Sequence, residues 1–520
     1  MGTSNNTGRI AKNTMALYFR MLLQMCISLY TARVILDALG DVDYGLYSVV
    51  GGVLAIFTFI NGTLIAATQR FISYSIGTND EEVLRQTVAS SKALHLIFAG
   101  LTLLIGETIG LWVLNTYINI PAGSEFAANV VYQLSIISAI FTITQVPYTA
   151  MIIAYERMEI FAYASIAEAV IKLGIAMSLG LFAANRLEIY SLFMLLTVVV
   201  MWFIWRGFSR RNFAVGKQPM KLYRGTIKEM TSFASWNMFG TLASSASVHG
   251  INILINIFFG ARVNTARAIA YQVTNTVTQF TTNLNMAVNP QITQSYASGN
   301  LSYMHSLIYW GCKISYCLLM IISIPLIIEM PTILTWWLGD YPPFTVILCQ
   351  LALIDAMLFA ISSPLITSSL ATGRIKTYQI VVGGLYLLLL PIVFIVLKLG
   401  GSPQSTLVVS IIINLITLFA RLYMLRSMIQ ISIRSYSYKV LVPLFFTSII
   451  APILPVIIHL NIGNDILRVI SVGIISVLWS VVVVYYVGLN RSERAKVIEV
   501  FRHYVSSKLN LKQSNNAQLF

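Results

Sequence analysis

Polar side chains inside apolar segments are the residues of this chain that could do chemistry. Between Tyr271 and Ser295, fifteen of 25 residues are Asn, Gln, Ser or Thr. Amides and hydroxyls donate and accept hydrogen bonds without a fixed charge, which suits the hydroxyl groups of a sugar. Because a polar group in hydrocarbon costs free energy, such a segment faces protein or water. We therefore predict that it lines a water-filled cavity.

A second polar stripe recurs every three or four positions between residues 237 and 256, the spacing of one helix face. Residues 20–31 and 61–73 show similar polar groups. Interhelical hydrogen bonds that only hold a bundle together are the alternative explanation, and they account well for isolated Ser and Thr. The predicted solute-lining residues are Asn237, Thr241, Ser245, His249, Asn252, Gln272, Asn275, Gln279 and Asn283.

Three basic residues inside apolar segments, Arg20, Arg70 and Lys172, are candidates for holding a phosphate or diphosphate. A guanidinium group binds phosphate oxygens in a bidentate manner. Glu168 precedes Lys172 by one helical turn, so a structural ion pair is the alternative there. Arg20 and Arg70 lie near segment ends, where a long side chain can also reach the membrane interface.

Asp355 is the acidic residue least able to reach water, about eleven residues into its apolar segment. A carboxylate in that position is a candidate coupling site for H⁺ or Na⁺. A hydrogen bond to a neighbouring helix is the alternative.

Sequence motifs of common catalysts are missing from the chain. It contains no GxxxxGK[ST] loop, no HExxH, no CxxC and no GxSxG. All four cysteines lie in apolar runs, which predicts packing rather than metal binding or disulfides. We expect neither a cofactor nor an enzymatic activity.

The elements that must position these residues are membrane-spanning helices. Hydrophobic residues make up 57% of the chain and charged residues 10%, whereas a soluble domain carries about 25% charge. Apolar runs of 18–25 residues recur, long enough to cross about 30 Å of hydrocarbon. The sequence therefore predicts an all-α polytopic membrane protein of about fourteen spans. The predicted spans are 14–36, 45–75, 89–114, 127–151, 161–183, 189–206, 229–259, 266–296, 305–328, 344–371, 378–397, 405–426, 440–460 and 467–488.

The distribution of basic residues predicts the orientation. The loop 206–228 holds seven Lys and Arg, whereas the loops 115–126 and 329–343 hold none. Cytoplasmic loops carry this excess of positive charge, so both termini are predicted to be cytoplasmic. The same rule explains the net charge of +15 without a nucleic-acid partner.

An internal repeat divides the chain. At an offset of 220 residues, Gly40 aligns with Gly260 and Asp80 with Asn300. Paired halves are a common transporter construction, with the substrate between them. We expect two pseudo-symmetric six-helix lobes and two further helices. The predicted divisions are an N-lobe (1–228) with its basic linker (206–228), a C-lobe (229–439), two spans (440–488) and a basic cytoplasmic tail (489–520).

The first eighty residues carry a recognisable turn, in which Leu39-Gly40 is followed by Tyr44-Gly45 and Tyr47. With the Asn289-Pro290 pair, the span count and the two-lobe layout, this turn resembles Wzx-type O-antigen and capsular polysaccharide flippases. These proteins form the polysaccharide transporter family of the MOP superfamily, which also contains the MATE transporters. Arg20 and Arg70 match, by general position, the basic residues that related flippases place around a diphosphate.

The resemblance implies a protein of the bacterial inner membrane. Its substrate would be an undecaprenyl-diphosphate-linked oligosaccharide, moved from the cytoplasmic to the periplasmic leaflet for lipopolysaccharide or capsule synthesis. The implied mechanism is alternating access coupled to an ion gradient. Membrane lipid and polysaccharide polymerases would be its partners.

Two alternatives stay open. A MATE-like multidrug or cation antiporter would share the fold but usually presents an acidic or aromatic cavity. A polymerase or ligase of polysaccharide assembly would need a large periplasmic loop with catalytic Arg and His. The longest predicted outer loop here is 329–343, about fifteen residues without Lys or Arg.

Overall fold

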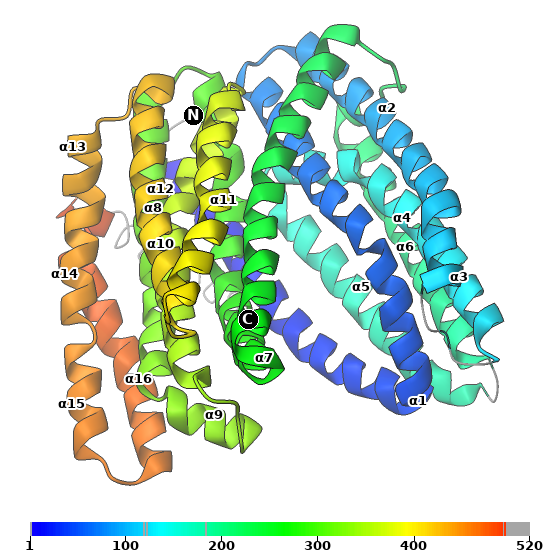
Figure 1. Cartoon of the computed structure of the whole chain (residues 1–520). Helices are drawn as coiled ribbons and strands as arrows, with labels where there is room; N and C mark the ends of the chain where they lie inside the picture. The colour runs from blue at the N-terminus through cyan, green and yellow to red at the C-terminus, as the bar shows by residue number, and fades with distance from the viewer. Residues whose placement is uncertain (1–2, 118–119, 121–122, 183–184, 492, 496–520) are drawn as a thin grey trace, which may run out of the picture.

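The chain is a bundle of long helices, and the computed structural model contains no strand among the residues it describes (Figure 1). These residues are 3–117, 120, 123–182, 185–491 and 493–495. Helices satisfy their backbone groups internally, as a hydrocarbon environment demands. The N-terminal helices are α1 (Thr3–Gly77), α2 (Glu81–Ile105), α3 (Leu111–Tyr117), α4 (Glu125–Ala154), α5 (Met158–Ser178) and α6 (Arg186–Asn212). The later helices are α7 (Arg224–Ala297), α8 (Leu301–Ile328), α9 (Met330–Leu338), α10 (Thr345–Thr372), α11 (Lys376–Lys398), α12 (Ser405–Ile429), α13 (Ile433–Tyr436), α14 (Val442–Ile450), α15 (Ile453–Asn461) and α16 (Asp465–Val483).

The predicted all-α membrane fold is confirmed. In the described part of the chain, twelve helices are long and apolar enough to cross a membrane. Two more long segments are the halves of α1 and α7 that follow Gly40 and Gly260. The second of these halves contains the amide-rich stretch and is therefore too polar to count among the twelve apolar helices. One difference is α9, a short helix with proline in its first turn, which occupies the predicted loop 329–343.

A single glycine interrupts each of the two longest helices. Gly40 in α1 has φ 76° and ψ 171°, and Gly260 in α7 has φ 78° and ψ 179°. This backbone region is essentially restricted to glycine, so each residue makes a sharp turn between two helical segments. The two positions are those paired by the sequence offset, and they have the same backbone conformation.

The correspondence continues to the ends of both helices. Asn79 and Gly299 have positive φ angles of 54° and 74°. The next residues, Asp80 and Asn300, each cap the following helix with their side chains. Helix termini need such acceptors for their free N–H groups. The aligned block therefore has the same local structure in both halves.

Helices α1 to α6 form one lobe and α7 to α12 form the other (Figure 1). Helix α1 packs on α4 and α5, α7 packs on α10 and α11, and α1 and α7 meet between the lobes. The lobes converge where residues 213–223 join α6 to α7, and diverge toward Gly40 and Gly260 (Figure 1). We call these regions the linker end and the glycine end.

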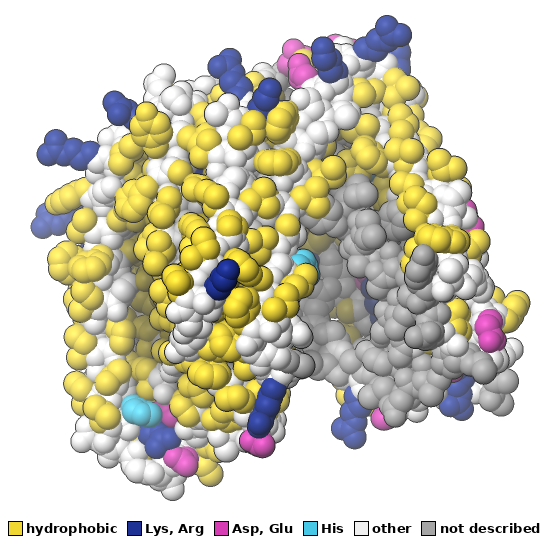
Figure 2. All heavy atoms as spheres, in the orientation of Figure 1, with side chains coloured by type: hydrophobic (Ala, Val, Ile, Leu, Met, Phe, Trp, Pro, Cys, Tyr) yellow, Lys and Arg dark blue, Asp and Glu magenta, His cyan; other side chains and the backbone are white. Residues whose placement is uncertain are grey.

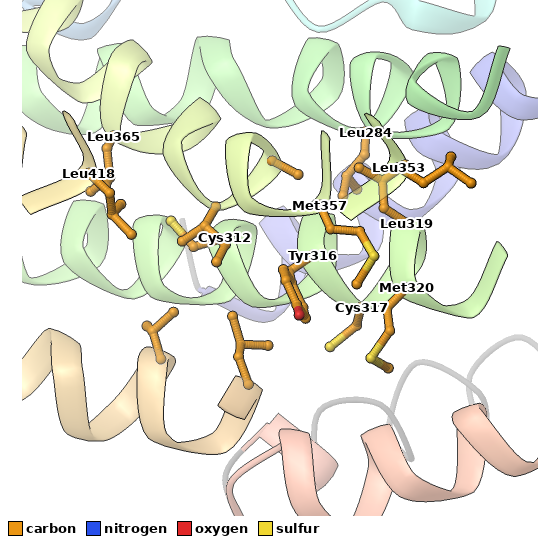
Figure 3. Close-up of a cluster of buried hydrophobic side chains, with 14 of the residues drawn as sticks. Leu284, Cys312, Tyr316, Cys317, Leu319, Met320, Leu353, Met357, Leu365 and Leu418 are labelled. Carbon is orange, nitrogen blue, oxygen red and sulfur yellow. The ribbon is translucent and has the colours of Figure 1, made fainter. Parts of the chain in front are cut away.

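The largest apolar core lies in the second lobe, around α8 and α10 (Figure 3). Tyr316 of α8 and Met357 of α10 belong to it, together with the buried Cys312 and Cys317. These cysteines pack as apolar side chains, as predicted. Cys26 differs, because it is exposed on α1.

The C-terminal helices are fastened to the second lobe by two ionic contacts. Lys313 of α8 forms a buried ion pair with Glu493 beyond α16. Glu329, which is 1% exposed, bonds His459 of α15 at 2.7 Å and Arg468 of α16 at 3.2 Å. The Lys313 contact lies near the middle of α8 and the Glu329 contact at its C-terminal end, so together they hold the C-terminal helices in register with α8. Residues 496–520 of the predicted basic tail lie outside the described residues.

The connection between the lobes is bound to the first of them. The buried Lys92 of α2 donates to the carbonyls of Gly216 and Gln218, both at 2.8 Å. The backbone N–H of Tyr223 donates to Ser90 of α2 at 3.4 Å. The linker is therefore fixed against α2 from residue 216 to the start of α7.

Candidate functional site

A cavity lies between the lobes, and it has two chambers that share Tyr271 and Asn275 in their walls. The outer chamber, about 1160 Å³, is lined by α1, α5 and α7. The inner chamber, about 870 Å³, is also lined by α4, α10, α11 and α12. A notch separates the lobes at the glycine end (Figure 2). The volume of each chamber suits a sizeable polar solute.

The amide-rich half of α7 supplies the most polar wall. Gln272, Asn275, Gln279 and Asn283 recur at helical spacing and all line the outer chamber. On the neighbouring face, the hydroxyl and amide side chains line the inner chamber. These are Thr274, Thr278, Thr281, Thr282, Asn285 and Asn289. The structure therefore places this stretch in the cavity wall, and contact of its side chains with a solute stays a prediction.

The first half of α7 faces the cavity with a different stripe from the predicted one. Of the predicted residues on this half, only Asn252 lines a chamber. Asn237 is buried and accepts a hydrogen bond from Gln379 at 3.2 Å. Thr241 and His249 are exposed, and Ser245 is half-buried without lining a chamber. The cavity face is instead Ser244, Ser247, Val248 and Ile251.

The cause of this correction is geometric. Neighbouring helix positions point about 100° apart, so a shift of one residue moves a side chain to another face. Both faces carry polar residues, because Asn237 bonds Gln379 of α11 whereas Ser244 and Ser247 line the cavity. The spacing of polar residues alone does not show which face of α7 lines the cavity.

Arg20 is a cation without an acidic partner among the described residues. It lies in the outer chamber wall, where its Nη2 donates to Asn283 at 2.7 Å. The guanidinium lies 5.0 Å from the ring centre of Phe161, and its buried Nε has no hydrogen-bond partner. A guanidinium held by a neutral amide and an aromatic ring keeps its charge available to an anion.

Lys172 lines the same chamber but is compensated. Its Nζ donates to Glu168 at 2.6 Å, one turn earlier on α5. The ion pair considered from the sequence is therefore present. Both side chains are about one-third exposed to the chamber.

Arg70 does not join these two residues. Its Nε and Nη2 donate to the carbonyls of Leu370 and Ala371 at the end of α10, at 3.2 and 2.8 Å. Rings of Phe71, Tyr74 and Phe233 surround the guanidinium. The three-residue cationic patch expected from the sequence is thus not assembled, because the Arg70 guanidinium instead donates hydrogen bonds to α10 of the other lobe.

Further contacts between the two lobes close the cavity at the linker end. Gln294 of α7 donates to the carbonyl of Ala154 at 2.8 Å, and Gln291 donates to the Glu156 carboxylate at 3.0 Å. Gly77 of α1 packs so closely on Gln294 and Ala297 that a Cβ there would lie 2.6–2.7 Å from their atoms. The cavity is therefore closed at the linker end and opens toward the glycine end.

Asp355 lines the inner chamber in the second lobe. Its carboxylate accepts hydrogen bonds from Ser410 at 2.9 Å and Asn414 at 2.6 Å, both on α12. Asp355 therefore makes the hydrogen bonds to a neighbouring helix and also lies beside a cavity.

Two buried arginines that the sequence analysis did not single out lie in the same region. Arg267 is 1% exposed and Arg421 is 2% exposed. Arg421 donates to the hydroxyls of Tyr378 and Tyr386, and Tyr386 donates to Asn414 at 3.0 Å. A polar ladder in the otherwise apolar α12 could have revealed the network. Its members, three or four residues apart, are Thr406, Ser410, Asn414, Thr417 and Arg421.

No group of His, Cys, Asp or Glu in the described chain is arranged to hold a metal ion.

No known protein-family model matches this chain, and no curated protein matches its sequence. Solved structures match its fold. An outward-facing multidrug resistance MATE family transporter of the MOP superfamily gives a TM-score of 0.70 at 12% identity, covering 83% of this chain and 98% of that one. A MATE transporter of Vibrio cholerae in the bent form gives 0.67 at 14% identity, with coverages of 84% and 100%.

A third structure is a MOP superfamily transporter from Pyrococcus furiosus, for which a reverse polarity of the binding pocket suggests a different function. It gives a TM-score of 0.67 at 13% identity and covers 83% of this chain and 98% of that one. At these identities the similarity shows the fold, which is that of MATE and MOP transporters.

Proposed function

We propose that this chain is a transporter that moves a lipid-linked oligosaccharide carrying a diphosphate across a bacterial inner membrane. The observation that carries the proposal is Arg20, a guanidinium without an acidic partner in the described chain, in a chamber whose α7 wall is rich in amides and hydroxyls. The cation suits a diphosphate, and the amides suit sugar hydroxyls.

The proposed orientation places the linker end in the cytoplasm. Seven Lys and Arg lie between residues 206 and 228, as the positive-inside rule requires. In that orientation the cavity opens to the periplasm, the side on which the glycan would be released. Opening to the cytoplasm would require breaking the contacts of Arg70, Gln291 and Gln294.

We extend the proposal to the driving force and the pathway. An H⁺ or Na⁺ gradient would drive the change between the two openings, with Asp355 as the coupling residue. The product would pass to polysaccharide polymerases that build O-antigen or capsule from it.

A second candidate function is a MATE-like antiporter of drugs or cations. One carboxylate favours it, because Asp355 lines the inner chamber without a direct ion pair among the described residues, whereas Glu168 in the same wall is paired with Lys172. A cationic solute would be attracted to that wall.

The test of the proposed function is deletion of the gene followed by analysis of lipid-linked intermediates. We expect single undecaprenyl-linked repeat units to accumulate on the cytoplasmic side and surface polysaccharide to disappear. Altered drug resistance without such accumulation would instead establish the antiporter.

Arg20→Ala tests the diphosphate contact within the same assay. Loss of hydrogen bonds to a charged group costs about 1.5–3 kcal/mol, so we expect transport to fall roughly 10- to 100-fold at unchanged membrane levels. Arg33→Ala is the matched control, because Arg33 lies on the same helix, 82% exposed beside Asp37. Equal activity of both variants would remove the diphosphate contact from the proposal.

A further inference from the structure

The interior of the second lobe holds three charges on neighbouring helices. Asp355 of α10 lies between Arg267 of α7 and Arg421 of α12, linked to Arg421 through Asn414 and Tyr386. Asp355 and Arg267 interact electrostatically without a direct ion pair. The sum of these three charges is one positive unit.

The oxygen atoms around Arg267 come from three positions. Nε donates to Asn252 at 2.8 Å, Nη2 donates to the hydroxyl of Tyr271 at 2.9 Å, and Nη1 donates to Thr406 at 3.4 Å. Amide, hydroxyl and carboxylate oxygens are also the ligands that hard metal cations take from proteins. The guanidinium therefore occupies an oxygen-rich space of the type that would otherwise suit a free cation.

Thr406 is one helical turn from Ser410, which bonds Asp355. The oxygen groups around Arg267 and those around Asp355 thus lie on the same face of α12. A free cation beside Asp355 would share this face with a fixed guanidinium. Like charges repel each other more at a partly buried site than in bulk water, because protein screens them less.

We propose that Arg267 is a built-in counter-cation that excludes Na⁺ and other metal cations from Asp355. This inference rests on the proposed function, since it specifies the ion that the transporter uses. Of the two ions considered, only a proton can act at Asp355, because a proton adds to a carboxylate oxygen and needs no ligand shell. Arg267 is then the residue that determines ion specificity.

The test is Na⁺ binding to the purified full-length protein, measured as a shift in melting temperature and as equilibrium binding of ²²Na⁺. NaCl is compared with choline chloride at equal ionic strength. We expect the wild-type protein to show no Na⁺-specific shift. Arg267→Gln, which removes the guanidinium charge, should gain a saturable shift of about 2 °C or more. The gain should vanish in the double variant Arg267→Gln, Asp355→Asn.

Two further variants control for charge and for folding. Arg267→Lys keeps a cation and should not gain Na⁺ binding. Arg262→Gln makes the same charge change at an exposed position of the same helix and should behave as wild type. Sodium binding by the wild-type protein that is lost in Asp355→Asn would overturn the proposal, and so would a folded Arg267→Gln protein without any Na⁺ response.

The wild-type measurement decides the question even when Arg267→Gln does not fold. Because binding is measured without substrate, this test is also independent of the transported solute. An absence of oligosaccharide transport would reject the proposed function and leave the ion result standing.

Discussion

The two lobes have the same backbone frame but use buried positive charge in opposite ways. In the first lobe, Arg20 keeps an unpartnered Nε and faces the outer chamber. In the second lobe, Arg267 donates three hydrogen bonds and is 1% exposed. Gly40 and Gly260 nevertheless turn the chain with nearly identical φ and ψ. A repeat in backbone therefore does not imply a repeat in chemistry, because the partners of the two arginines differ. Arg20 contacts Asn283 and Phe161, whereas Arg267 bonds Asn252, Tyr271 and Thr406.

Among the variants that test this difference between the lobes, Asp355→Asn should have the largest effect, which is a loss of stability. The substitution keeps the shape and removes the only acidic group of the network, leaving Arg267 and Arg421 uncompensated. Asp355 is half-buried and makes no direct ion pair with a described residue, and losing the charge that accepts hydrogen bonds from Ser410 and Asn414 costs about 1.5–3 kcal/mol. We therefore expect a clearly lower melting temperature in detergent. Asp340→Asn, at an exposed loop position, should melt like wild type. Equal melting of the two variants would show that the network carries no stabilising charge interaction.

A smaller effect is expected where the lobes touch. Gly77 and Ala297 are equivalent by the 220-residue offset and pack on each other at the linker end. Gly77→Ala would place a Cβ 2.6 Å from the Gln294 carbonyl. Overpacking costs about 1–3 kcal/mol, which disfavours the state closed at the linker end.

This shift can be measured by chemical labelling. A cysteine in place of Thr278, in the inner chamber, should react faster with an impermeant maleimide from the linker side in Gly77→Ala, with Cys26 replaced by Ser. Gly62→Ala on the same helix meets nothing within 4 Å and is the control. Unchanged labelling in Gly77→Ala would mean that this contact does not determine which end is open.

The smallest effect is expected at Lys172. Its partner Glu168 lies one turn away at 2.6 Å and both are partly exposed, and such pairs contribute about 0.2–0.5 kcal/mol. Lys172→Gln should therefore change transport by about twofold or less, in contrast to Arg20→Ala. A loss as large as that of Arg20→Ala would place both cations in one binding site.

The fold could be predicted because its signals are local. Apolar length gives the spans, and the pairing of Gly40 with Gly260 identifies the two turns. The composition of residues 271–295 placed that segment at the cavity, since fifteen polar groups cannot face lipid.

The site was predicted less completely, because its determinants are distant in sequence. Nothing near Arg70 indicates that its donors reach Leu370 and Ala371. The partners of Arg421, Tyr378 and Tyr386, lie in apolar α11, where a tyrosine alone gives no functional signal. Only packing reveals which polar groups meet.

The hydrogen bonds that Lys92 donates to the linker and that Ser90 accepts from Tyr223 fix the start of α7 against the first lobe. The junction therefore acts as a pivot, and the segment Arg224–Gly260, 37 residues long, acts as a lever attached to it. At 1.5 Å per residue this lever is about 55 Å long. A tilt of only about 10° at its fixed end would move Gly260 by roughly 10 Å. Small rearrangements beside α2 are thus amplified at the far mouth of the cavity.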